Sequence, residues 1–206
     1  MPRKTNKIPS NKTILIVVEG QTEQIYFSEM NVFERIPGIT VASRESTHSD
    51  IEHVISTAIK EYSSGVYDSI WCVYDRDTVE KDNLEEKLSK LLKKATSKGI
   101  RIADSMPAFE IWFLSHYQKP QLYYADQNSV IEELKKYIDG YDKDKRWLER
   151  RKLYSLLKEK QEQAITNCEK LEKAKNEYGD NCTSCRVHEL ILFILNSSNS
   201  KIQRNN

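Results

Sequence analysis

The chain has 206 residues, which is enough for one sizeable domain or for a main domain with a small helical appendage. Its net charge of +1 gives no argument for a general attraction to nucleic acid. No apolar run approaches the roughly 18 residues of a membrane-spanning helix, so no membrane partner is expected. Residues 1–12 are basic and polar, without the apolar core of a secretory signal. We therefore expect a cytoplasmic protein with flexible tails over residues 1–12 and 199–206.

The first half of the chain alternates strand and helix patterns. Helical spacing of apolar residues begins at Thr22, again at a capping box formed by Ser49 and Glu52, and again after Asp82. Short runs rich in β-branched residues predict the strands Ile14–Val18, Ile39–Ser43, Ile70–Tyr74 and Arg101–Asp104. Such alternation is typical of a mainly parallel sheet with helices on its faces.

The second half has helical patterns only. They cover residues 108–117, 127–138, 144–160, 161–178 and 184–196. The fold class predicted is therefore α/β, with a Rossmann-like, mainly parallel sheet of about four strands in residues 13–117. Residues 118–198 are expected to form a helical C-terminal extension that packs on this core. Phe109, Trp112 and Phe113 are expected in the core rather than on a base-stacking surface.

Acidic residues follow two of the predicted strands directly. Glu19 follows Ile14–Val18, and Asp75 and Asp77 follow Ile70–Tyr74. Ligands of open α/β sheets bind beyond the carboxyl ends of the strands. Carboxylates held close together require a cation or a proton, and their hard oxygen ligands suit Mg²⁺ or Mn²⁺. Each acid alone is equally typical of a turn or a helix cap, but the joint pattern favours a metal site.

A zinc site is a weaker alternative. Cys182 and Cys185 form a single CxxC motif, and His188 follows three residues later. A structural zinc site usually needs four ligands, and the sequence offers no obvious fourth.

Two resemblances narrow the interpretation. An apolar strand ending in Glu-Gly, followed about fifty residues later by an apolar strand ending in Asp-x-Asp, resembles the Toprim domain of topoisomerases, primases and several nucleases. The stretches ILIVVEGQTEQIYF, IWCVYDRD and SMPAFEIWFLSHY, with the weaker GYDKDK and NCTSCRVHELILFIL, resemble the RloB-like family. That family implies a Toprim fold, a nuclease effector of bacterial restriction and phage defence, and in some members an AAA-type ATPase partner.

The resemblance places Glu19 in the Toprim glutamate position, as metal ligand or general acid/base, and Asp75 and Asp77 in the Asp-x-Asp positions. Glu23 is a further catalytic candidate, or simply an acid favoured near a helix N-terminus. Glu110 and His116 are the remaining catalytic candidates. Six residues of helix separate their directions by about 120°, so we favour Glu110, and His116 is equally well explained as a helix-end residue.

A basic stretch near GYDKDK is the candidate nucleic-acid contact. Lys143, Lys145 and Arg146 can bind backbone phosphates. The same stretch carries acids, so a solvated, salt-bridged helix face explains it equally well.

The function predicted is metal-dependent hydrolysis of phosphodiester bonds in DNA or RNA, with Mg²⁺ or Mn²⁺ as cofactor. The alternative is a non-catalytic module that binds nucleic acid or nucleotide and signals to a partner ATPase, which the neutral charge balance favours. Nucleotidyl transfer is a weaker third option. The substrate sugar, the trigger, the number of metal ions and the state of homo-oligomerisation stay open.

Overall fold

The computed structural model describes residues 12–43, 51–76, 85–179 and 181–202. Four strands match the predicted ones closely: β1 (Ile14–Val18), β2 (Ile39–Ser43), β3 (Ser69–Asp75) and β4 (Arg101–Met106). They are parallel, as predicted. A fifth strand, β5 (Ser184–Cys185), pairs antiparallel with the end of β4. The sheet order is β2-β1-β3-β4-β5.

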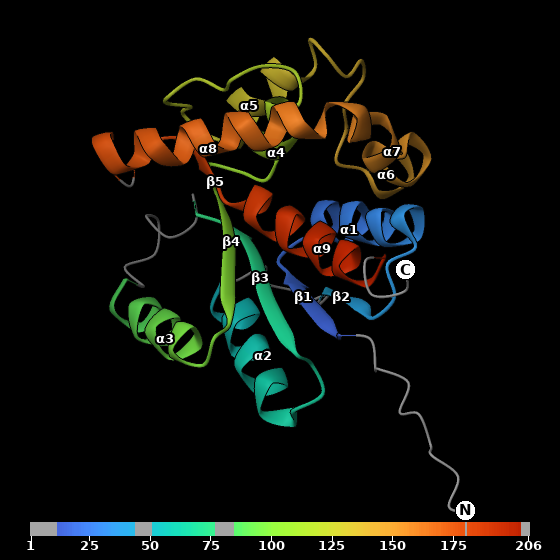
Figure 1. Cartoon of the computed structure of the whole chain (residues 1–206). Coiled ribbons are helices and arrows are strands. Elements are labelled where there is room, and N and C mark those ends of the chain that lie inside the picture. Colours follow the sequence, from blue (N-terminus) through green and yellow to red (C-terminus); the bar gives the residue numbers. More distant parts are fainter. Residues whose placement is uncertain (1–11, 44–50, 77–84, 180, 203–206) are drawn as a thin grey trace, which may run out of the picture.

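Helices cover both faces of this sheet (Figure 1). α2 (Ile51–Ser64) and α3 (Glu85–Ser97) pack on one face with the side chains of Leu15, Val17 and Cys72. α1 (Gln21–Glu34) and α9 (Val187–Ile202) pack on the other. Every residue of β1 is buried, which is the burial expected of a central parallel strand.

The remaining helices extend the second face. They are α4 (Glu110–Ser115), α5 (Gln127–Leu134), α6 (Lys145–Arg151), α7 (Leu153–Leu157), the 3₁₀ turn η2 (Lys158–Lys160) and α8 (Gln161–Tyr178). Their apolar residues join the hydrophobic cluster of α1 and α9. The second half of the chain thus contributes both to the sheet, through β5, and to the main core.

Two helical predictions need correction. The helix predicted over 184–196 begins only at Val187, because Ser184 and Cys185 pair with β4. It also continues to Ile202 rather than ending at Asn196. The helix predicted over 144–160 is divided at Lys152, whose φ of 54° lies in the left-handed region. The cap residues Ser49 and Asp82 lie outside the described residues.

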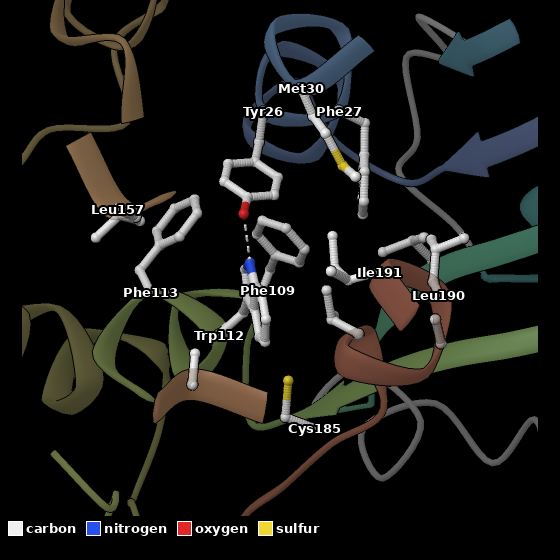
Figure 2. Packing of buried hydrophobic residues seen from close by; sticks show 14 of the residues in the cluster. Tyr26, Phe27, Met30, Phe109, Trp112, Phe113, Leu157, Cys185, Leu190 and Ile191 are labelled. Atoms are coloured by element: carbon white, nitrogen blue, oxygen red, sulfur yellow. Dashed lines mark hydrogen bonds between the residues drawn. The ribbon is translucent and has the colours of Figure 1, made fainter. Parts of the chain in front are cut away.

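Aromatic side chains form the centre of the larger core (Figure 2). Phe109, Trp112 and Phe113 are fully buried, as predicted. Tyr26 of α1 packs edge-on against Phe109, and its hydroxyl oxygen accepts a hydrogen bond from the indole N–H of Trp112 at 2.8 Å. This bond joins the first helix of the chain to α4 inside the core.

We expect Tyr26→Phe to lower the free energy of unfolding by about 1–3 kcal/mol, because it leaves the buried indole N–H of Trp112 without an acceptor. Urea unfolding followed by circular dichroism measures the change. Tyr62→Phe removes the same atom from a ring that is 45% exposed, and we expect it to change stability by less than about 0.5 kcal/mol. Equal effects of the two substitutions would contradict the role of this bond.

Candidate active site

The candidate site lies where the strand order reverses. β1 and β3 are neighbours, while β2 follows β1 on the other side, so the connections leave β1 and β3 in opposite directions. Ligands of open α/β sheets bind at such a point. Glu19 is the first residue after β1, and Asp75 is the last residue of β3. The Glu19 carboxylate accepts a hydrogen bond from the backbone N–H of Asp75 at 3.0 Å, so the two predicted acids lie together.

Glu23 reaches the same place from the first turn of α1. It is only 5% exposed. A Cβ atom on Gly20 would stand 2.8 Å from Oε2 of Glu23. Gly20 has a φ of −127°, which any residue adopts. A side chain at position 20 would therefore have to displace the Glu23 carboxylate from its place beside the end of β1.

Glu110 is the most enclosed of the acids, with no exposed surface at the first residue of α4. Its carboxylate accepts hydrogen bonds from the Tyr141 hydroxyl at 2.8 Å and from the Gln127 side-chain amide at 3.2 Å. The Lys143 ammonium lies 3.3 Å from Oε1 of Glu110. The helical second half of the chain therefore supplies the three side-chain partners named here for this buried acid.

Glu19, Glu23, Asp75 and Glu110 form what we call the carboxylate cluster. Burial raises the pKa of Glu23 to about 7, and the charges of Glu110 and Glu19 add to the effect. Burial also raises the pKa of Asp75 well above its usual range, again helped by the neighbouring carboxylates. Like charges this close favour binding a proton or a cation.

Lys143 supplies positive charge to the carboxylate cluster. Burial lowers its pKa, but the charges of Glu110, Glu23 and Asp75 outweigh burial, and the pKa of Lys143 is raised overall. Its side chain remains 41% exposed, so the ammonium group reaches the cluster from the solvent side. Lys143 is a predicted nucleic-acid contact, and the structure places it beside the acids.

The oxygen donors of the carboxylate cluster match Mg²⁺ or Mn²⁺ in type. Within the described ranges, no three His, Cys, Asp or Glu side chains converge closely enough to hold a metal ion directly. Asp77, the third ligand predicted, lies outside those ranges. Burial is the main cause of the raised pKa values of Glu23 and Asp75, and the neighbouring carboxylates add to it. The residues therefore fit a divalent cation by the type of their oxygen donors.

The other predicted site residues lie elsewhere. Lys145 and Arg146 are exposed at the start of α6, and Lys145 lines a surface hollow with Gln24 and Lys152. His116 is fully buried, and its Nδ1 lies 2.8 Å from the Trp112 carbonyl oxygen. Burial lowers the pKa of His116 to about 4, so this imidazole is neutral at pH 7. We leave His116 out of the proposed site.

Cys168, Cys182 and Cys185 are buried. Cys182 donates to the Gly179 carbonyl oxygen. Cys185 interacts with Cys168 and lies 3.9 Å from the Ser105 hydroxyl. Burial alone would raise the pKa of Cys168, but hydrogen bonds with Cys185, His188 and Ser115 lower it to about 6. Cys168 on α8 and Cys185 on β5 therefore lie at the contact between that helix and the sheet.

Sequence reasoning missed two partners of the site, Gln127 and Tyr141. Tyr141 stands two residues before Lys143 in GYDKDK, so that motif combines an acid-binding hydroxyl and an ammonium group on one short loop. GYDKDK is one of the stretches that resemble the RloB-like family, and this resemblance could have indicated that Tyr141 lies at the site. Gln127 left no such signal.

Comparison with known proteins shows the family of the chain. The model of the family described as RloB-like protein matches residues 14–194, which is most of the chain. No curated protein and no solved structure matches. No helix among the described residues is long and apolar enough to cross a membrane. The matched region includes the carboxylate cluster, Asp77 and the GYDKDK loop, and the chain belongs to the RloB-like family.

Proposed function

We propose that this protein is a nuclease with a Toprim-like site that uses Mg²⁺ or Mn²⁺ to hydrolyse phosphodiester bonds in DNA or RNA. The carboxylate cluster at the reversal of strand order carries the proposal. Four acids from β1, α1, β3 and α4 meet there, and the raised pKa values of Glu23 and Asp75 favour a bound cation. A fold has no structural need to place so many acids where they repel each other.

The residues have different parts in this proposal. Glu19, Asp75 and Asp77 would hold the metal ion, with Glu23 and Glu110 completing the negative environment. A divalent ion bound there activates water and stabilises charge on a phosphate oxygen. Glu19 is positioned by the Asp75 backbone N–H, and Glu110 by Tyr141 and Gln127. Lys143, which is partly exposed, can contact an incoming phosphate while remaining paired with Glu110.

Cleavage assays on single- and double-stranded DNA and RNA test the proposal. We expect cleavage with Mg²⁺ or Mn²⁺ and none in EDTA. Glu19→Ala and Asp77→Ala are expected to reduce the rate by at least about a hundredfold while the fold is retained. Glu86→Ala is the control, because this acid on α3 is 85% exposed. Wild-type cleavage by both site variants would overturn the proposal.

A sensor module acting with a partner ATPase is the second candidate, and the net charge of +1 favours it. The role in phage defence and the AAA-type partner rest on the family resemblance. Calorimetry with a purified AAA-type ATPase as the candidate partner separates the two functions. Tight binding without cleavage of any nucleic acid by the complex supports the sensor, and cleavage by the complex supports the nuclease.

A further inference from the structure

Two arginines lie at the carboxyl edge of the sheet, next to the carboxylate cluster but directed to the other face. Trp71 and Val73 of β3 pack in the core of α1 and α9, whereas Cys72 and Tyr74 pack in the core of α2 and α3. The backbone N–H of Arg76 donates to the Ser105 carbonyl oxygen at 2.9 Å, which continues the pairing of β3 with β4. By this alternation Arg76 shares a face with Tyr74, opposite Asp75.

Asp104 of β4 holds both arginines. It is the register partner of Tyr74 and is only 3% exposed. One carboxylate oxygen lies 2.8 Å from Nε of Arg76, and the other accepts a hydrogen bond from Nε of Arg186. The backbone N–H of Arg186 also donates to the Asp104 carbonyl oxygen at 2.9 Å. Arg186 follows β5 directly, so the short antiparallel strand fixes its position.

The arrangement leaves part of Arg186 available. Nε makes its bond to Asp104, and the described residues offer no hydrogen-bond acceptor for its terminal amino groups. The Arg186 side chain is 33% exposed. Arg76 also donates to the Ser184 hydroxyl. One buried carboxylate therefore orients two guanidinium groups, and the carboxylates of Glu172 and Glu189 interact with Arg186 only electrostatically.

We propose that Arg76 and Arg186, oriented by Asp104 and Ser184, bind a backbone phosphate of the nucleic acid on the α2 and α3 side of the carboxyl edge. The inference rests on the proposed nuclease function. Planar guanidinium groups suit bidentate contacts with phosphate oxygens. Arg76 is the chain neighbour of Asp75, so a strand crossing the end of β3 can reach both the arginine pair and the carboxylate cluster. The arginines are binding residues here and take no part in the chemistry.

Binding measured without metal tests the arginine pair. The probe is a fluorescently labelled single-stranded oligonucleotide, in DNA and RNA forms, followed by anisotropy in EDTA over a range of salt concentrations. We expect Arg186→Gln to weaken binding about tenfold and to reduce the slope of log affinity against log salt by about 0.7, the value for one phosphate contact on a single strand. The loss should be uniform across sequences, since backbone phosphates carry no base information.

Arg101→Gln is the matched control. Arg101 is exposed at the first residue of β4, the strand that carries Asp104 near its other end, and its substitution removes the same charge. We expect it to bind like the wild type. If Arg186→Gln fails to fold, the assay uses the double variant Asp104→Asn with Arg186→Gln. This variant removes the buried charge of Asp104 together with the charge of Arg186.

The outcomes separate this inference from the proposed nuclease function. If folded Arg186→Gln or the double variant keeps the wild-type affinity and salt slope, the phosphate-binding role of the arginine pair is contradicted, even if the protein cleaves nucleic acid. Absence of oligonucleotide binding by the wild type overturns it as well. If binding depends on Arg186 but the protein never cleaves nucleic acid, the phosphate site is supported and the proposed nuclease function is contradicted.

Discussion

Asp75→Asn is expected to reduce metal-dependent cleavage by at least about a hundredfold and, in the same protein, to raise the stability of the metal-free fold. The two effects have one cause. Asp75 is partly buried at the end of β3, and burial and the charges of Glu23, Glu110 and Glu19 all raise its pKa. Asparagine keeps the backbone N–H that donates a hydrogen bond to Glu19, but it removes the negative charge that the neighbouring acids repel. We expect the melting temperature of the metal-free protein to rise at pH 7.

Cleavage assays and thermal unfolding in EDTA measure the two effects together. Asp68→Asn is the control at the other end of β3. Asp68 is exposed, and hydrogen bonds from the backbone and side chain of Thr13 lower its pKa. The same substitution there should slightly lower the melting temperature and leave cleavage unchanged. A loss of stability in Asp75→Asn would show that the carboxylate stabilises the empty fold, contrary to the crowding inferred here.

The metal-free protein should lose stability through Glu23 as the pH rises from about 4.5 to about 7. The pKa of this buried carboxyl is about 7 in the folded protein, against 4.5 as its ordinary value. The folded state therefore holds a proton that the unfolded state has released within this range. Its contribution is fully present below pH 4.5 and disappears above pH 7, by about 2–3 kcal/mol.

Comparison of the wild type with Glu23→Gln isolates this contribution, since glutamine does not titrate. The comparison is necessary because His116 acts in the opposite direction. Its pKa of about 4 lies below its usual 6.5, so its contribution grows as the pH rises between those values. Chemical unfolding in EDTA at pH 4.5 and pH 7.5 should show the stability difference between the two proteins changing with pH. A constant difference contradicts the raised pKa.

Added Mn²⁺ extends this experiment. A cation in the carboxylate cluster binds the deprotonated acids, so it should restore wild-type stability at pH 7.5 and have little effect at pH 4.5. The same metal should stabilise Glu23→Gln less. Stabilisation that is equal at both pH values would place the ion at another part of the molecule.

The strands of the first half could be predicted because they are continuous apolar runs. Ile14–Val18 has no polar residue, and a central parallel strand buried on both faces requires such a run. The acids after β1 and β3 were predictable for the same reason. Parallel strands end at one edge, so residues at their carboxyl ends meet whatever the detailed packing.

The helical second half was harder to predict. Ser184 and Cys185 precede a strongly apolar helix and were assigned to it, but pairing with Ser105 and Met106 of β4 makes them a strand. Two residues are too few to show a period of two. Lys152 divides another predicted helix. Its backbone is left-handed, a conformation that usually indicates glycine, so nothing in the sequence indicated the break.

Sequence alone determined the family, the alternation of strands and helices, and the meeting of Glu19 with Asp75, since each depends on motifs or on the order of residues along the chain. Tertiary structure decided which other residues join them. Glu110 entered the cluster and His116 did not, although both lie on or beside one short helix, because the two sides of α4 face different surroundings. Lys143, a predicted phosphate contact, is also a partner of Glu110 because residues 127–143 fold back over α4. Contacts between segments that far apart arise only from packing, which no local pattern records.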